Sequence, residues 1–209
     1  MKLGREALEA LQEEITGRLT PGDELAVVGA VALKGTARLA EEKKEILRRY
    51  FSQGFLENAA SLYQEFGTGE DPKKSEAWEI AVKAGATALY AMGEGGFLAA
   101  LWKMAEASQV GLSADFFKVP IRQESIEICE IFDLNPYRLL SDGAILLGIP
   151  AGEAIVREYR RRGLMAAVIG QVQAGNRRLL YSRENARYLE RPMPDEIYKV
   201  LPGYKGERA

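Results

Sequence analysis

Gly93, Gly95 and Gly96 follow a short apolar run and lead directly into a helical pattern. The run Ala86 to Ala91 predicts a strand, and the spacing from Phe97 to Ser108 predicts a helix. A glycine-rich turn between a strand and a helix leaves backbone N–H groups at the positive end of the helix dipole, which suits a phosphate or another anion. The alternative is a tight turn, in which glycine serves only positive φ and close helix packing.

Glu94 lies inside this turn, and its carboxylate has two interpretations. It could act as an acid/base group or as a metal ligand. It could equally be an acidic residue in the first turn of a helix, where the helix dipole favours negative charge.

Two further turns are expected at the ends of apolar strands. Lys34-Gly35-Thr36 predicts either a second anion-binding corner or a helix start, with Thr36 as N-cap and Lys34 in solvent. Ser141-Asp142-Gly143 either faces the same cleft or forms a plain turn, in which Asp is common. Because ligand clefts form at strand ends, we expect any ligand site where these two turns meet Gly93, Glu94, Gly95 and Gly96.

The composition excludes several kinds of catalytic site. The sequence has 209 residues, one cysteine and no histidine. A Ser-His-Asp or Cys-His nucleophilic site is therefore excluded within it, and the commonest zinc ligand is missing. We predict no catalytic residue and no metal site. Cys129 shares one side of a predicted helix, Gln123 to Phe132, with Ile128, which indicates a buried core residue.

Charge and hydropathy bear on partners and location. The formal net charge of −2 provides no overall basic field that would attract nucleic acid. No apolar run approaches the length of a membrane span, and the acidic amphipathic N-terminus differs from a signal peptide. We therefore expect no nucleic-acid partner, no membrane partner and a cytoplasmic location.

Helical periodicity and short apolar runs alternate along the chain. An amphipathic N-terminal helix is predicted within residues 1–20, and residues 21–209 are predicted to form one domain. Glu24 to Leu33 is rich in Val, Ala and Leu and predicts a buried strand. This mixture predicts an α+β fold, in which several helices flank a mixed sheet.

The C-terminal third contains one turn signal between two candidate strands. Ala174-Gly175-Asn176 predicts a β-hairpin between Ala166–Gln173 and Arg177–Tyr181. Short helical pieces are predicted over Glu184 to Leu189 and over Asp195 to Leu201.

Several blocks of the sequence carry a family resemblance, and they are Gly29–Ala40, Ala84–Ser108, Val119–Glu124, Glu127–Glu130, Asp133–Pro136 and Ser141–Ala144. Over about Gly22 to Val200 the sequence resembles the C-terminal domain of the aminoimidazole ribonucleotide (AIR) synthetase family. That superfamily includes a hydrogenase maturation protein that dehydrates a thiocarbamate, thiamine-monophosphate kinase and selenophosphate synthetase. The resemblance implies the fold of that domain, a mixed sheet flanked by helices.

The sequence departs from the family at the glycine turn. The hydrogenase-maturation branch, to which it is most similar, often carries Asp-x-Thr-Glu-Gly-Gly there. Ala91 stands in place of the Asp and Gly93 in place of the Thr, whereas Glu94, Gly95 and Gly96 match. Ala91 therefore offers no carboxylate for a metal and Gly93 no hydroxyl for a phosphate, although the backbone N–H groups remain.

The resemblance also implies an ATP-binding N-terminal domain with an acidic metal motif, for which residues 1–20 are too short. Two functions follow. The chain is a non-catalytic binding or accessory module for a phosphorylated small molecule, or it is one half of a split ATP-dependent enzyme. We assign no cofactor to the chain alone and expect ATP with Mg²⁺ only with a partner domain. We expect a homodimer that uses apolar surface at Tyr63, Phe66 and Trp78, or a complex with an ATP-binding-domain protein.

Overall fold

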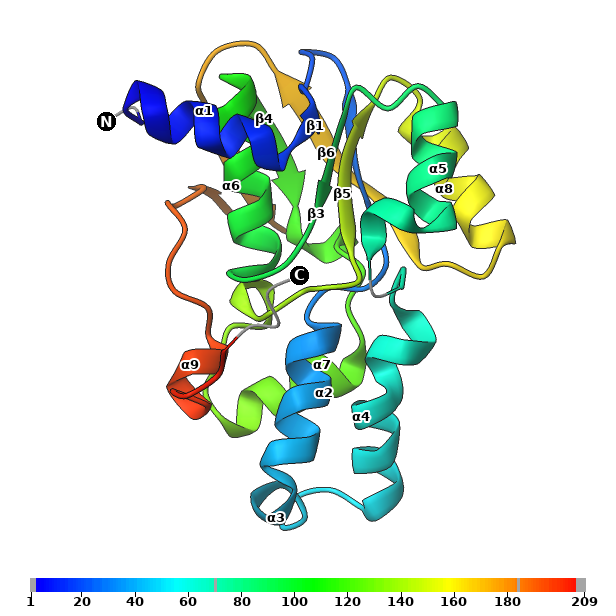
Figure 1. The fold of residues 1–209 in the computed structure, drawn as a ribbon, viewed down its shortest axis with the longest axis vertical. Coiled ribbons are helices and arrows are strands. Elements are labelled where there is room, and N and C mark those ends of the chain that lie inside the picture. The colour runs from blue at the N-terminus through cyan, green and yellow to red at the C-terminus, as the bar shows by residue number, and fades with distance from the viewer. Residues whose placement is uncertain (1–2, 70, 184, 206–209) are drawn as a thin grey trace.

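The computed structural model describes residues 3–69, 71–183 and 185–205. These residues form an α+β fold around an eight-stranded mixed sheet (Figure 1). The strand order across the sheet is β1-β3-β5-β2-β6-β4-β7-β8. The strands are β1 (Thr16–Gly17), β2 (Glu24–Val28), β3 (Ala88–Ala91), β4 (Gly111–Asp115), β5 (Ile145–Ile149), β6 (Ala166–Gln173), β7 (Arg178–Ser182) and β8 (Asn185–Tyr188).

Helices cover both faces of the central strands, so that β5 is buried along its whole length. On one face, α1 (Arg5–Glu14) and α6 (Gly96–Ser108) pack on the apolar side chains of β2, β4 and β5. On the other face lie α5 (Glu76–Lys83) and α8 (Gly152–Arg161) (Figure 1). This two-sided burial explains why β5 reads as a continuous apolar run rather than an alternating one.

A helical lobe lies beyond one end of the sheet (Figure 1). It consists of α2 (Leu33–Glu42), α3 (Lys44–Leu47), α4 (Gln53–Phe66), α7 (Gln123–Ile131) and α9 (Ile197–Val200). These helices share a core that includes Leu39, Leu56, Ile128 and Ile197. Short 3₁₀ helices complete the described elements: η1 (Pro72–Lys74), η2 (Phe116–Lys118) and η3 (Pro136–Arg138).

Several predictions from the sequence are confirmed by the structure. The fold is α+β, and the strand and helix that flank the glycine turn lie within two residues of their predicted positions. Cys129 is 1% exposed, as its place on the apolar side of α7 indicated. Burial raises the pKa of its thiol to about 12, so the group is inert at neutral pH.

The predicted strand over Glu24 to Leu33 is too long. β2 ends at Val28, Gly29 adopts φ +80°, and Leu33 already begins α2. Residues Ala30 to Leu33 are fully buried, but in a connection and a helix start. Apolar sequence alone does not separate a buried strand from a buried helix start.

The predicted hairpin between β6 and β7 is wrong, because β4 lies between these strands. β4 pairs antiparallel with β6 and parallel with β7. The hairpin partner of β7 is β8. The helical piece predicted over Glu184 to Leu189 is therefore wrong where the structure describes it, since Asn185–Tyr188 is a strand and position 184 lies outside the described residues.

Trp78 does not provide the apolar surface that was predicted for it. Its side chain is 8% exposed and packs in the core between α5, α8 and the sheet. Tyr63 and Phe66 are partly buried against the cluster around Leu62. None of the helices described is both long and apolar enough to cross a bilayer.

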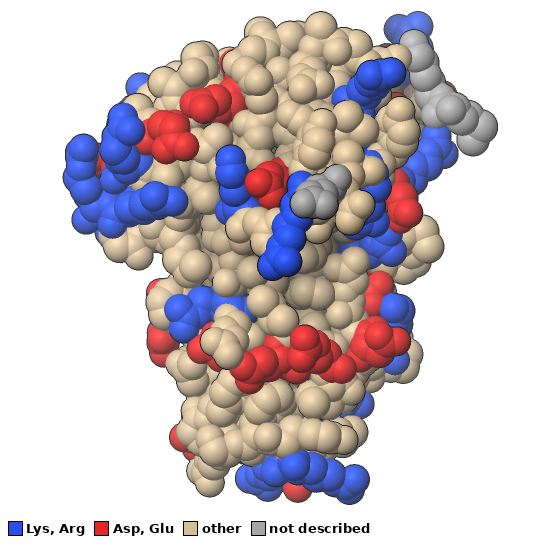
Figure 2. Space-filling model, turned by 180° about the vertical axis from the view of Figure 1, so that it is seen from behind, with Lys and Arg blue, Asp and Glu red and all other residues tan. Residues whose placement is uncertain are grey.

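Charged side chains of both signs are interspersed on the face shown in Figure 2. An acidic band crosses the helical lobe, and basic side chains gather at the tip of the lobe, where α3 lies (Figures 1 and 2). This distribution agrees with the small net charge of the sequence.

Candidate functional site

The glycine turn joins β3 to α6, and two of its glycines are required by the backbone. Gly95 and Gly96 have φ values of +77° and +61°, which residues with side chains rarely adopt. A Cβ atom at Gly95 would lie 2.6 Å from the Ala99 Cβ, and one at Gly96 would lie 2.6 Å from the Leu139 carbonyl oxygen. These two glycines therefore serve the tight turn and its close packing.

Gly93 is different from its neighbours. Its φ is not positive, and a Cβ atom there would meet only the Asp142 Oδ2 atom, at 3.9 Å. The position therefore has room for a Cβ atom.

Hydrogen bonds bring parts of the three predicted turns together. The Ser141 N–H donates to the Gly93 carbonyl over 3.2 Å, and the Gly35 N–H donates to the Leu140 carbonyl over 3.0 Å. The buried Ser141 hydroxyl accepts from the Ala32 N–H over 2.9 Å. Ser141 therefore connects the glycine turn to the start of α2.

Lys34, Gly35 and Thr36 lie within the first turns of α2 rather than before it. Thr36 is not the N-cap, because Ala32 occupies that position with φ +65°. The Thr36 hydroxyl is fully buried and donates to the Ser125 Oγ over 2.8 Å, so it faces α7. The Thr36 side chain is therefore not aimed at the glycine turn.

Lys34 and Gly143 meet at the ring of Tyr63. The Lys34 Nζ lies 4.4 Å from the ring centre, a cation–π distance. Gly143 has φ +85°, and a Cβ atom there would lie 2.8 Å from the Tyr63 Cε2. The Gly143 carbonyl accepts from the Thr68 N–H over 2.9 Å. Ser141 and Asp142, rather than Gly143, are therefore the members of this turn that lie beside Gly93.

Asp195 is the residue at this site that the sequence did not reveal. Its Oδ2 accepts from the Gly95 N–H over 2.7 Å, and its Oδ1 accepts from the N–H groups of Leu140 and Ile197 over 3.2 and 2.9 Å. The residue is 4% exposed. An oxyanion of the chain itself therefore occupies the N-terminal end of α6.

Burial raises the pKa of the Asp195 carboxyl to about 6, against the three N–H bonds that favour its charged form. The nearby charge of Glu94 raises it further. The Glu94 carboxylate is hydrogen-bonded to the Tyr198 hydroxyl and raises the pKa of that phenol. Glu94 therefore faces the segment that carries Asp195 and Tyr198. Among the described residues, no group of three His, Cys, Asp or Glu side chains is arranged to hold a metal ion.

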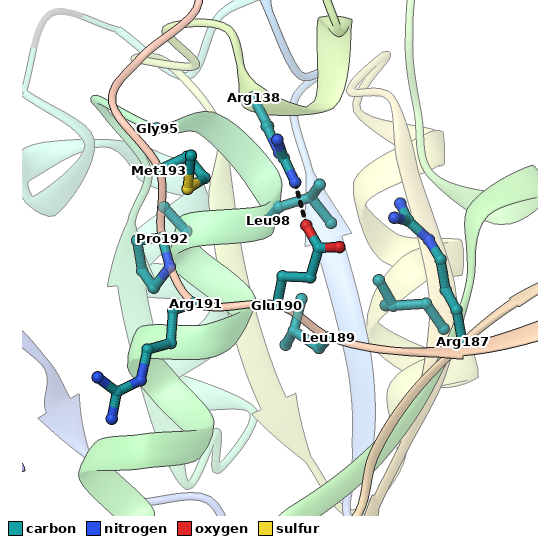
Figure 3. Close-up of a pocket in the computed structure, with 11 residues that line it drawn as sticks. Gly95, Leu98, Arg138, Arg187, Leu189, Glu190, Arg191, Pro192 and Met193 are labelled. Atoms are coloured by element: carbon teal, nitrogen blue, oxygen red, sulfur yellow. Dashed lines mark hydrogen bonds and ion pairs between the residues drawn. The ribbon is translucent and has the colours of Figure 1, made fainter. Parts of the chain in front are cut away.

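A small pocket lies beside the turn, between α6 and the segment that follows β8 (Figure 3). Its lining includes Gly95, Leu98, Arg138, Arg187 and Arg191. The Arg138 guanidinium is paired with the Glu190 carboxylate over 2.5 Å (Figure 3). The Arg187 guanidinium lies 5.2 Å from the centre of the Phe116 ring. The pocket therefore has arginine residues in its lining close to the glycine turn.

Few local signals in the sequence point to these additional residues. Asp195 follows Pro194 and begins a predicted helical piece, so it reads as an ordinary helix start. Arg138 lies in a short segment after Asn135-Pro136 and belongs to no recognisable sequence motif. Their roles depend on contacts between segments that are far apart in the sequence, 100 residues in the case of Gly95 and Asp195.

Comparisons with known proteins agree with this fold. Carbamoyl dehydratase HypE of Rhodobacter capsulatus is 25% identical over 196 residues, which are 90% of this chain and 54% of the relative. A solved structure of hydrogenase maturation protein HypE in complex with ATP matches with a TM-score of 0.59 and 18% identity, over 86% of this chain and 53% of that one. A HypE–HypF complex matches with a TM-score of 0.58 and 17% identity, over 84% and 54%. The structural matches show the shared fold.

The chain spans about half the length of these relatives. The family model that describes the AIR synthase related protein, C-terminal domain, matches residues 20–181. That segment includes the glycine turn, the start of α2 and the Ser141 turn. The chain therefore belongs to the family of AIR synthase related proteins, as a C-terminal domain of that type.

Proposed function

We propose that this chain is a non-catalytic binding or accessory module that holds a phosphorylated small molecule at the glycine turn. The observation that carries the proposal is the bound carboxylate: the N–H groups of Gly95 and Leu140 already accommodate an oxyanion at 2.7 and 3.2 Å. The nearby Arg138 guanidinium adds a positive charge. A phosphate offers the same acceptor atoms with more charge.

The missing side chains favour binding over catalysis. Ala91 and Gly93 replace the Asp and Thr that the hydrogenase-maturation branch carries at the turn. The turn therefore lacks the carboxylate and the hydroxyl of that motif, and its backbone N–H groups can hold a phosphate without them.

The second candidate is one half of a split ATP-dependent enzyme. The observation that favours it is the coverage of HypE of Rhodobacter capsulatus: the match takes in 90% of this chain but only 54% of the relative. HypE is also known in complex with ATP and in complex with HypF. By analogy, a separate protein would supply the nucleotide-binding half.

A thermal-shift screen of the purified chain against phosphate, pyrophosphate, nucleotides and sugar phosphates tests the first proposal. A ligand that binds only the folded state raises the melting temperature, by roughly 3–6 °C at ten times its Kd for a chain of this size. Gly93→Ala, which has room for its methyl group, is the matched control and should keep the shift. No shift with any of these anions would contradict the proposal.

ATP turnover separates the two candidates. The chain alone should not hydrolyse ATP, whereas the split-enzyme candidate requires turnover when a protein of the ATP-binding type is added. In that mixture the double variant Ala91→Asp/Gly93→Thr, which restores the related motif, should raise the rate. A mixture that stays inactive with both versions of the chain would contradict the second candidate, and magnesium-dependent turnover by the chain alone would contradict the first.

A further inference from the structure

A second pocket lies at the end of the sheet that faces the helical lobe. It has a volume of about 440 Å³ and lies between the loop that joins α8 to β6 and the segment that follows η2. Ala166 at the start of β6 pairs there with Val28 at the end of β2, from which the chain continues into the lobe (Figure 1). None of the described residues that line this pocket belongs to the glycine turn.

Backbone hydrogen bonds hold both walls of the pocket in place. The Val31 N–H donates to the Pro120 carbonyl over 2.9 Å, and the Gly29 N–H donates to the Met165 carbonyl over 2.8 Å. Both walls are thereby joined to the connection between β2 and α2. Small-molecule sites are usually preformed and have volumes of about 300–1,000 Å³, and this pocket agrees with both properties.

The lining combines an apolar surface with two cations. Apart from Gly163, its described members are the apolar residues Pro120, Leu164, Met165, Ala166 and Ala167 and the cations Lys118 and Arg160. No Asp or Glu is among the described residues of the lining. A neutral apolar ligand leaves both cations unused, and a small inorganic anion leaves the apolar surface unused. The lining therefore suits an anion that carries an apolar body.

Arg160 differs from the two arginines that follow it in the run Arg160-Arg161-Arg162. Arg161 and Arg162 pair with the Glu158 carboxylate over 3.0 and 2.8 Å. Arg160 instead donates from its Nε to the Ala166 carbonyl over 3.0 Å and has no carboxylate partner among the described residues. That bond holds the guanidinium at the pocket, and its two Nη atoms make no further hydrogen bond within the described part of the chain.

Lys118 lines the same pocket from the segment that follows β4. It is the last residue of η2, it is exposed, and its ammonium group has no ion pair or hydrogen bond to any residue that the structure describes. The Nε bond of Arg160 closes the loop between α8 and β6, which is a structural role. That role involves neither Lys118 nor the Nη atoms of Arg160, so both remain available to a ligand.

We propose that this pocket binds an organic anion in which one carboxylate or phosphate group is attached to an apolar body. The Arg160 guanidinium and the Lys118 ammonium hold the anionic group, and the body covers Pro120, Leu164 and Met165. Burial of the body supplies affinity, and the two cations fix its orientation. The site is separate from the glycine turn, so this inference goes beyond the proposed function and does not rest on it.

Amide NMR of the ¹⁵N-labelled chain with 2-naphthoate and with 2-naphthyl phosphate tests the site, and the tighter of the two probes identifies the anionic group. Shift changes should concentrate at Val119, Ile121 and residues 163–167. The neutral 2-naphthalenemethanol and the small anion acetate should each bind at least about fivefold more weakly, because each meets only one part of the lining.

Two variants and a matched control test the cations. Lys118→Met and Arg160→Met should each weaken binding of the tighter probe by about fivefold, the scale of one exposed ion pair. Lys118→Met removes no hydrogen bond between described residues, so its result does not depend on a change in the fold. The control Arg161→Met removes an equal charge from the same run and should bind as the wild type does.

Three results would overturn this inference. They are no binding of either naphthyl anion, affinities that are equal in the wild type, both variants and the control, and a neutral probe that binds as tightly as the anions. Shift changes at Gly93, Gly95 and Gly96 without changes at residues 163–167 would also overturn it, while they would support the anion site at the glycine turn.

Discussion

At the scale of single residues, the glycine turn combines two kinds of glycine. Gly95 and Gly96 hold positive φ and pack against neighbouring atoms, whereas Gly93 has open space beside it. The sequence identified this turn because glycine clusters between a strand and a helix are visible locally. It gave no means to separate the three glycines, since that depends on Leu139 and Asp142 from another part of the chain.

Alanine substitutions should therefore separate these glycines. Gly95→Ala should lower the free energy of unfolding by about 1–2 kcal/mol or more, because its φ is positive and its methyl group would collide with Ala99. Gly93→Ala should change it by less than about 0.5 kcal/mol. Urea unfolding measures both. Equal losses of the free energy of unfolding in the two variants would contradict the distinction between a strained Gly95 and a Gly93 with open space.

The Asp195 carboxyl predicts a pH dependence with a definite sign. Its pKa in the folded state is about 6, above the usual 3.8, because burial disfavours the charged form. Between about pH 4 and 6 the folded state therefore binds more protons than the unfolded state, and this group lowers stability as the pH rises, by at most about 1.4 kcal/mol per pH unit.

The difference in the free energy of unfolding between Asp195→Asn and the wild type separates the contribution of Asp195 from those of the other carboxylates. The stability of the variant relative to the wild type should rise from pH 4 to pH 6 and then level off. Denaturant unfolding at several pH values measures it. A relative stability that falls over this range would mean that the pKa is lowered instead.

At the scale of elements, the sequence predicted local structure well and pairing poorly. The helical spacing from Phe97 to Ser108 is a local signal, and the structure confirms it as α6 (Gly96–Ser108). The position of β4 between β6 and β7 depends on contacts between distant segments, so the turn signal at Ala174-Gly175-Asn176 does not reveal it. The start of α2 also lies within a run of buried apolar residues, so the sequence alone does not distinguish it from a strand.

A buried ion pair fixes β7 against α6 and offers a test of this strand order. The Arg178 Nη1 lies 2.7 Å from the Glu106 Oε2, and both side chains are largely buried. Glu106→Ala leaves the Arg178 charge without this partner and should cost about 3 kcal/mol in the free energy of unfolding. Glu79→Ala breaks an exposed pair with Lys83 and should have almost no effect. Similar effects of the two changes would contradict the burial of the Arg178 pair.

At the scale of the whole molecule, the described residues form an eight-stranded sheet with helices on both faces, and the chain matches about half the length of its HypE relatives. How this chain assembles is therefore part of the proposed function. We expect a homodimer, or a complex with a protein of the ATP-binding type. Light scattering at high concentration and co-purification with such a protein measure this. A strict monomer that forms no such complex would contradict both expectations.

The most direct test of the central claim is a titration of the ¹⁵N-labelled chain with pyrophosphate, followed by amide NMR. The account predicts that shift changes concentrate at the amides of Gly93, Gly95, Gly96 and Leu140. Changes confined to other surfaces, or no change at these amides at saturating anion, would contradict an anion site at the glycine turn.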